Sequence, residues 1–299
     1  MTAPLLSQSG QRRTPVIPVP NLLPTEPPKG RWIGSPPRSQ PTYPPCGSVI
    51  KVSDPVPDQS ATHIRQPLRF SPRRLPAPEP TADYLVRSFF EPKKLPNPKS
   101  LLVVLDLNGT LLARSRGGGT ITERPYLARF LGYCLKHHSV MIWSSAQPES
   151  VAQMCGKIFN PQQREKLVQE WGRDTLELTN KDYYEKVQVY KRLDRIWDDI
   201  LLQSKHPCYK TLGRWCQANT VLIDDSRLKA QKQPFNHIEI PEYTIRSCDE
   251  GTGMEVLGQV VGYLEELRQW DDVSRFIRAN NFEIDMGWSW DWEECPAAS

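Results

Sequence analysis

The chain has 299 residues, a formal net charge of +4 and 29 prolines, and it contains no apolar run near the ~18 residues that a membrane span needs. An apolar signal core is missing near the first residue, and the seven cysteines form no Cys-x-x-Cys pair, as is typical of reduced thiols. These features exclude a helical membrane protein and predict an intracellular protein of the nucleus or cytoplasm.

The first hundred residues differ in composition from the rest. They hold 22 of the 29 prolines and carry 14 Lys plus Arg against six Asp plus Glu, whereas the remainder carries 24 against 28. A segment this rich in proline cannot bury enough apolar surface to offset the entropy cost of ordering. We therefore predict that residues 1–97 form a disordered, basic, Pro-rich tail.

The tail allows more than one role. Its Pro-Pro pairs could present polyproline helices to partner proteins, with a featureless solvated tail as the alternative. Arg12 and Arg13, with no acid in the first 25 residues, suit a mitochondrial presequence, but Pro15, Pro18 and Pro20 break the helix that such a signal needs. Dispersed basic pairs are usually solvated, so we do not expect a nucleic acid partner.

The most informative strand signal is the apolar run 101–105, which ends at Asp106 and is followed by Asn108-Gly-Thr110. An unbroken apolar run is typical of a strand buried on both faces of a parallel sheet. Open α/β sheets bind ligands at the carboxyl ends of their strands, so Asp106 is placed for chemistry, and Asn108 tends to share its face. The alternative is that Asp106 ends a core strand and a turn follows.

This segment resembles the first motif, Asp-x-Asp-x-Thr, of the haloacid dehalogenase superfamily, and within it of the RNA polymerase II carboxy-terminal-domain phosphatases, also called NLI-interacting-factor-like. The resemblance implies that Asp106 is the nucleophile and that Thr110 belongs to the phosphate-binding loop. This chain has Asn108 where the family has its general acid and base. An amide can be neither at ordinary pH.

A glycine-rich stretch and a helix follow the first motif. Residues 114–123 contain three consecutive glycines between short β-type segments, which suits a mobile hairpin over the site or a plain connecting loop. Pro125 then begins a helix with apolar spacing, and two histidines end it at 137 and 138.

A second short buried strand is predicted at 139–144, followed by a helix at 149–159. The family's second motif is a strand that ends in Thr or Ser, and this strand has the same place in the order of motifs along the chain. The resemblance therefore implies that Ser144, with Ser145 as the fallback, binds the phosphate. Capping the following helix is the structural alternative for Ser144, and the two roles are compatible.

Residues 161–187 are charged and are expected to form helical and loop insertions. The next segment, 187–197, alternates in hydropathy and then becomes helical in pattern. The family places a phosphate-holding Lys ahead of a Leu at this stage of the chain. Lys191 fits this order, and Arg192 is the substitute.

A third buried strand is predicted at 220–223, ending at Asp224 and Asp225. Adjacent carboxylates in apolar surroundings repel each other, and a bound cation removes the penalty. The family's fourth motif supplies magnesium ligands. The resemblance therefore implies that Asp225 binds Mg²⁺, with Asp224 beside it to orient Lys191 or water. A helix N-cap role for one of the two is the alternative.

The remaining chain predicts an edge strand at 238–240 and helices at 256–270 and 273–282. Residues 284–299 form a Trp/acidic C-terminal tail. This tail could be a docking strand for a partner, but we expect it to fold back on its own domain because three exposed indoles are a liability.

The resemblance implies that residues 98–283 form an α/β domain with a doubly wound parallel sheet, haloacid dehalogenase-like and Rossmann-type, with the site at the carboxyl ends of the strands. It also implies a magnesium ion held by Asp106, the backbone carbonyl of Asn108, and the pair Asp224 and Asp225. The expected partner is a phosphorylated protein or peptide substrate.

Two functional hypotheses follow. In the first, the chain is a phosphoprotein phosphatase of the serine/threonine type that forms an aspartyl phosphate on Asp106, with activity reduced or altered because of Asn108. In the second, it is a catalytically inactive phosphatase-fold binding or scaffold protein, such as a subunit that resembles the mitochondrial inner-membrane translocase receptor.

Overall fold

The computed structural model describes residues 73, 75–115, 120–246 and 256–292, and the prediction of a disordered tail over residues 1–72 lies outside them. Among the described residues no helix is long and apolar enough to cross a membrane. The described cysteines, Cys134, Cys155, Cys208 and Cys216, are all free.

A five-stranded sheet forms the centre of the domain, and all of its strand pairs are parallel. The spatial order is β5-β4-β1-β6-β7. The strands are β1 (Leu102–Leu105), β4 (Ser139–Trp143), β5 (Glu170–Trp171), β6 (Thr220–Asp224) and β7 (His237–Glu239). From β1 the chain builds the sheet in one direction through β4 and β5, and then returns to add β6 and β7 on the other side. This doubly wound order confirms the predicted fold class.

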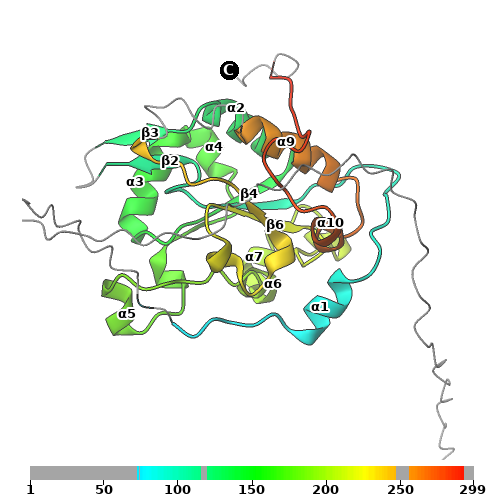
Figure 1. Cartoon of the computed structure of the whole chain (residues 1–299), viewed down its shortest axis with the longest axis horizontal. Helices are drawn as coiled ribbons and strands as arrows, with labels where there is room; N and C mark the ends of the chain where they lie inside the picture. The colour runs from blue at the N-terminus through cyan, green and yellow to red at the C-terminus, as the bar shows by residue number, and fades with distance from the viewer. Residues whose placement is uncertain (1–72, 74, 116–119, 247–255, 293–299) are drawn as a thin grey trace, which may run out of the picture. The chain divides into compact units, whose positions relative to one another are not determined.

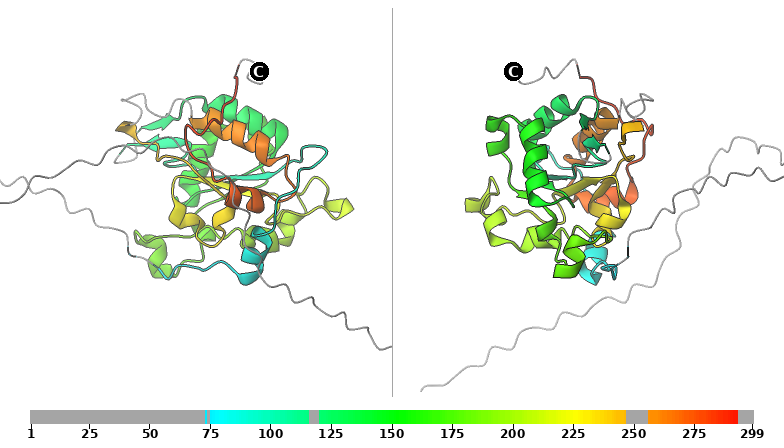
Figure 2. Two further views of the ribbon diagram at one scale, coloured as in Figure 1. Left: turned by 45° about the vertical axis from the view of Figure 1, so that its right-hand side comes forward. Right: turned by 90° about the vertical axis from the view of Figure 1, so that its left-hand side faces the viewer.

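Helices and connecting segments cover both faces of the sheet, as the views in Figures 1 and 2 show. On one face Val103 and Leu105 pack with residues of α2 (Leu127–His137), α3 (Pro148–Ile158), α9 (Val256–Leu267) and α10 (Val273–Ala279). On the other face Leu102 and Val104 pack with residues of α6 (Asp194–Asp198) and α7 (Ile200–Gln203). Burial on both faces explains why the central strands read as continuous apolar runs.

The connections contain shorter elements. They are α4 (Pro161–Glu165), η1 (Arg173–Thr175), α5 (Asn180–Tyr184), η2 (Tyr209–Thr211), η3 (Arg227–Ala230) and η4 (Pro234–Asn236). The residues on either side of the three glycines pair as antiparallel strands, β2 (Leu112–Arg114) and β3 (Ile121–Glu123). Residues 116–119, which include the glycines, are outside the described residues, so the predicted mobility of this stretch stays a prediction.

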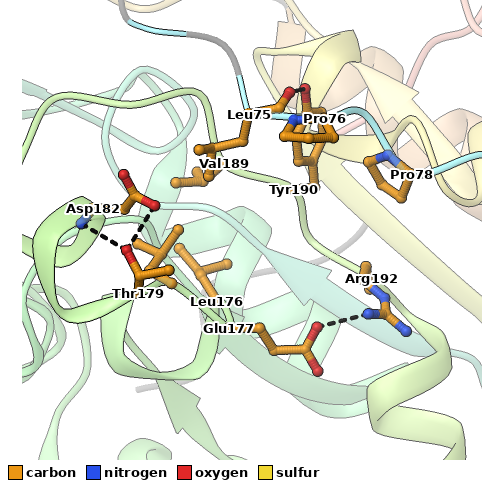
Figure 3. Close-up of a pocket in the computed structure, with 11 residues that line it drawn as sticks. Leu75, Pro76, Pro78, Leu176, Glu177, Thr179, Asp182, Val189, Tyr190 and Arg192 are labelled. Atoms are coloured by element: carbon orange, nitrogen blue, oxygen red, sulfur yellow. Dashed lines mark hydrogen bonds and ion pairs between the residues drawn. The ribbon is translucent and has the colours of Figure 1, made fainter.

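The end of the predicted tail is folded. Residues 82–88 form α1 (Ala82–Ser88), capped by the Thr81 hydroxyl, which accepts a hydrogen bond from the Tyr84 amide. Leu75, Pro76 and Pro78 line one wall of a pocket of about 340 Å³, and the Tyr190 hydroxyl donates to the Leu75 carbonyl (3.0 Å; Figure 3). The prediction that disorder extends to residue 97 is therefore wrong for residues 75–97.

Tyr84 is the anchor of this N-terminal segment. Its side chain is 5% exposed and stacks on Phe235, and its hydroxyl accepts a hydrogen bond from the Phe235 amide at 2.8 Å. The Gln217 side chain donates to the Tyr84 carbonyl and to the hydroxyls of Ser88 and Ser274, each at 2.9 Å. These contacts join residues that are far apart in the chain, so proline content alone gave no sign of them.

We expect Tyr84→Ala to lower the free energy of unfolding by about 3 kcal/mol, because the change empties a buried aromatic site and leaves the Phe235 amide without its acceptor. Urea denaturation measures the difference. Val86→Ala on the same helix is the control: Val86 is 59% exposed, and a change below about 0.5 kcal/mol is expected. A similarly small effect at Tyr84 would mean that α1 does not pack on the domain in solution.

The described part of the C-terminal tail packs on the domain, which confirms that it folds back. Trp292 is 8% exposed and stacks on Tyr126, with 5.5 Å between the ring centroids. Trp288 contacts the Tyr263 ring edge-on at 4.9 Å. A Cβ at Gly262 would collide with the backbone of Ser289, so α9 needs glycine there to let the segment approach.

His138 is buried where α2 ends and β4 begins. Its Nδ1 accepts a hydrogen bond from the Leu101 amide (3.2 Å), so the proton of the neutral ring is on Nε2, which faces the Tyr133 hydroxyl at 3.2 Å. Burial, followed by the charges of Arg268 and His137, lowers the pKa of His138 to about 3. The native state therefore holds this imidazole neutral.

This depressed pKa predicts acid sensitivity. His138 takes up a proton in the unfolded chain near pH 6.5 but resists it in the folded one, so its stabilising contribution is full above about pH 6.5 and is lost as the pH falls toward 3. We expect it to supply about 2 kcal/mol of the loss in unfolding free energy between pH 7 and 5. His138→Gln should flatten the pH profile measured by denaturant unfolding. The half-buried His137 is the control, and an equal flattening by His137→Gln would contradict the assignment.

Candidate active site at the carboxyl ends of β1 and β6

The central carboxylates lie where the direction of strand order reverses. Asp106 directly follows β1, and Asp224 is the last residue of β6, the neighbouring strand. Both are buried, with exposed fractions of 1% and 0%. A crevice at such a reversal point is where open α/β sheets bind ligands. Because β1 and β6 are parallel neighbours, the sheet order places Asp106 and Asp224 side by side at the predicted edge.

A tight loop holds the first motif against the fourth. Leu111 and Leu112 donate backbone hydrogen bonds to the Leu107 carbonyl (2.9 Å each). Gly109 has φ +84°, and a Cβ there would lie 2.8 Å from Oδ2 of Asp225, so only glycine fits. The buried Thr110 hydroxyl accepts a hydrogen bond from the Asp225 amide at 3.1 Å. Thr110 thus fixes the position of Asp225.

Lys191 lies between the two buried carboxylates. Its Nζ is 2.9 Å from Oδ1 of Asp106 and 2.6 Å from Oδ2 of Asp224, and its side chain is fully buried. Arg192, the predicted substitute, instead pairs with Glu177 (2.6 Å) and is about one third exposed. The order of motifs along the chain therefore selected the lysine that contacts Asp106.

A second lysine, which the sequence did not predict, completes the cluster. Lys229 lies on η3, and its Nζ donates hydrogen bonds to Oδ2 of Asp106 (3.0 Å), Oδ1 of Asp224 (2.9 Å) and Oδ1 of Asp225 (3.1 Å). Its side chain is 14% exposed. The spacing in the sequence could have indicated this contact. Lys229 is four positions after Asp225, and residues with this spacing face each other when the chain is helical.

The charges in the cluster control one another. Burial favours the neutral form of Asp224, but Lys191 and Lys229 outweigh it and hold the pKa of Asp224 below its ordinary value. For Asp225, burial and the charges of Asp224 and Asp106 outweigh Lys229 and raise its pKa to about 6. Burial alone would lower the pKa of Lys229, but the three carboxylates raise it above its ordinary value. Both Asp224 and Lys229 are therefore charged at neutral pH.

The predicted serines are close to the site in the sheet but do not join the cluster. Ser144 is buried and lies two residues beyond the Leu105–Ile142 pair of β1 and β4. Its hydroxyl accepts a hydrogen bond from the Ala146 amide at 3.4 Å. Among the described residues, no hydrogen bond links Ser144 or Ser145 to the carboxylates. Their phosphate-binding role stays a prediction.

Asn108 is half-buried in the motif-one loop, and its side-chain Oδ1 is buried with no hydrogen-bond partner among the described residues. Glu123, an acid that could replace the carboxyl missing at position 108, is exposed on β3. The loop is braced instead by Arg124, which is 2% exposed and donates to the Pro241 carbonyl (2.5 Å) and the Gly109 carbonyl (3.5 Å).

The carboxylates suit a hard cation. One oxygen from each of Asp106, Asp224 and Asp225 can be chosen so that the three lie within 4.8 Å of one another. Anionic oxygens are the donors that Mg²⁺ prefers, so the donor set fits the expected metal. The Lys229 ammonium contacts all three of these residues, so a cation and this side chain draw on the same donors.

Comparison with known proteins shows where the chain belongs. An uncharacterised FCP1 homology domain-containing protein of Schizosaccharomyces pombe is 35% identical over 218 residues, which are 70% of this chain and 87% of the relative. A solved structure of a variant of the fission yeast RNA polymerase II CTD phosphatase Fcp1, bound to beryllium fluoride, is 15% identical with a TM-score of 0.34. The match covers 48% of this chain and 42% of that one, so this chain spans less than half of that Fcp1 chain.

A putative 3-deoxy-D-manno-octulosonate 8-phosphate phosphatase from Vibrio cholerae is 10% identical with a TM-score of 0.28, covering 69% of this chain and 94% of that one. The family model described as NLI interacting factor-like phosphatase matches residues 101–274. The family model and the Schizosaccharomyces pombe relative do not support the alternative of a translocase-receptor-like scaffold. With more than half of its residues matched, the chain belongs to the NLI interacting factor-like phosphatase family.

Proposed function

We propose that the chain is a magnesium-dependent phosphatase of phosphorylated proteins that works through an aspartyl phosphate on Asp106. The observation that carries the proposal is the buried contact between Asp106 and Lys191 at the point where the strand order reverses. Family membership supplies the reaction class, phosphate ester hydrolysis. The serine/threonine specificity and the identity of the phosphoprotein belong to the proposal.

In the proposed reaction, one carboxylate oxygen of Asp106 attacks phosphorus in line, the ester oxygen leaves, and water later hydrolyses the acyl phosphate. Negative charge on the equatorial oxygens is the part that the protein must stabilise. Lys191 is the nearest fully buried cation, and we assign it this role. Thr110, Ser144 and Ser145 are the proposed hydroxyl contacts of the bound phosphate.

Asp106, Asp225 and the backbone carbonyl of Asn108 are the proposed metal ligands, with Asp224 beside them. When bound, Mg²⁺ would neutralise charge on the phosphoryl oxygens. A backbone carbonyl is unaffected by the exchange of Asp for Asn at position 108. Phosphate and metal binding are therefore expected to be retained, while proton transfer to the leaving group is weakened.

The proposal also includes partners that bind the N-terminal prolines, and a location in the nucleus or cytoplasm. The pocket in Figure 3 is lined by none of the cluster residues, so we do not assign it to the phosphate site.

A trapping experiment tests the nucleophile without needing fast turnover. Beryllium fluoride binds a free aspartate and mimics its phosphorylated form, and a ligand that binds only the folded state raises the melting temperature. With magnesium and beryllium fluoride present, we expect a higher melting temperature for the wild type and none of this gain for Asp106→Asn. Slow hydrolysis of a phosphoserine peptide should also disappear in Asp106→Asn. An equal response of both proteins in both assays would remove the support for Asp106 as nucleophile.

A further inference from the structure

Lys229 occupies an unusual place for a lysine. Its ammonium has three N–H groups, and the structure gives each a carboxylate: Asp106 at 3.0 Å, Asp224 at 2.9 Å and Asp225 at 3.1 Å. These are the same three residues whose oxygens converge as a potential cation site. The ammonium therefore has the donors that a divalent cation would need.

The cluster leaves few oxygens for a second cation. Both oxygens of Asp106 contact a lysine, Oδ1 through Lys191 and Oδ2 through Lys229. Both oxygens of Asp224 are used in the same way, and its Oδ1 also accepts a hydrogen bond from the Ser226 amide at 3.0 Å. A divalent cation bound through Oδ2 of Asp106 and Oδ1 of Asp225 would have to take the oxygens that Lys229 now holds.

The backbone of Lys229 is fixed, whereas its side chain has room to leave. Its carbonyl accepts a hydrogen bond from the Lys191 amide (2.7 Å), and its amide donates to the Ser226 carbonyl (3.0 Å). The side chain reaches the cluster from a solvent-accessible direction, with 14% exposed, unlike the fully buried Lys191. A long flexible stem on a fixed backbone can move its charged end without refolding η3.

We propose that Lys229 is the resident cation of the carboxylate cluster and that a divalent cation binds only by displacing its ammonium. This inference rests on the proposed function in one respect, since it describes how the site of that reaction is regulated. It predicts that the chain binds divalent metal weakly, and that metal binding releases a positive side chain at the mouth of the phosphate site. A lysine that kept its contacts with the carboxylates when metal bound would not be released in this way.

Manganese titration provides the first test. Mn²⁺ prefers the same oxygen ligands as Mg²⁺, and its free concentration is read by electron paramagnetic resonance. We expect Lys229→Met to bind Mn²⁺ at least about tenfold more tightly than the wild-type chain, because a competing charge in contact with three carboxylates is removed. Arg227→Met is the matched control, since it removes an exposed charge from the same short helix.

The control should stay within about twofold of the wild type, as expected for a solvent-screened charge. Equal affinity in Lys229→Met and wild type overturns the proposal, and so does an equal gain in Arg227→Met. Absence of Mn²⁺ binding in every protein also overturns it, because there would then be no displacement.

Amine labelling of the wild-type chain gives a second test that needs no folded variant. A lysine held by three carboxylates reacts slowly with an acylating ester, and mass spectrometry reports its rate separately from that of Lys232, three residues away. Saturating Mn²⁺ should increase the acylation rate of Lys229 several-fold and leave that of Lys232 unchanged. Mn²⁺ binding without faster acylation of Lys229 overturns the proposal. Neither readout requires turnover, so failure here is distinct from failure of the Asp106 trapping and hydrolysis assays.

Discussion

Asn108→Asp is expected to raise phosphatase turnover by about 10²-fold or more, because a general acid and base contributes ~10²–10⁴-fold and the substitution is nearly isosteric. The amide oxygen of Asn108 is buried without a partner among the described residues, in the loop that follows Asp106. A carboxyl there would stand two residues from the nucleophile. Steady-state hydrolysis of an aryl phosphate with magnesium present measures the gain.

The control for this prediction is the same substitution made together with Asp106→Asn, which should give no gain because no aspartyl phosphate can form. A high wild-type rate with little gain would mean that another acid already serves. No turnover in any of the variants, with beryllium fluoride still binding, would favour a phosphate-binding role over catalysis.

The sequence predicted those site residues that lie at strand ends. Asp106 and Asp224 follow apolar runs, and parallel strands that neighbour each other bring their carboxyl ends to one edge. Lys191 was found by its position in the chain between these two strands, an order of motifs that the resemblance supplied. The other contacts in the carboxylate cluster depend on the conformation of the loops that follow the strands. Hydrophobic periodicity in the sequence does not predict loop conformation.

Lys229 shows this limit. Its contact with Asp225 requires a short 3-10 helix directly after β6, and four residues carry too little pattern to predict one. Residues 75–97 show a second limit, since local composition argued for disorder there. Tyr84 is ordered by Phe235 and Gln217, which lie more than 130 positions away in the chain. Tertiary contacts of this range override local composition and can be seen only in the folded structure.

Lys191→Met is expected to lower the free energy of unfolding by about 3 kcal/mol, which is the size of effect seen when one partner of a buried ion pair is removed. The change leaves Oδ1 of Asp106 and Oδ2 of Asp224 buried without their ammonium, at 1% and 0% exposure. Lys229 still contacts Oδ2 of Asp106 and Oδ1 of Asp224 and neutralises part of their charge. The loss of unfolding free energy should therefore be at the lower end of the range for a broken buried ion pair. Denaturant unfolding at pH 7 measures it.

Two comparisons separate this cause from a simple loss of side-chain packing. Arg192→Met changes the neighbouring residue, whose ion pair with Glu177 is about half exposed to solvent, and should cost less than about 1 kcal/mol. Adding Asp224→Asn to Lys191→Met removes the unpaired charge and should recover a large part of the lost stability, because the buried cluster then has one fewer carboxylate to neutralise. A double variant as unstable as the sum of its single changes would show that Lys191 acts through packing, and its assignment as the charge partner of Asp106 and Asp224 would fail.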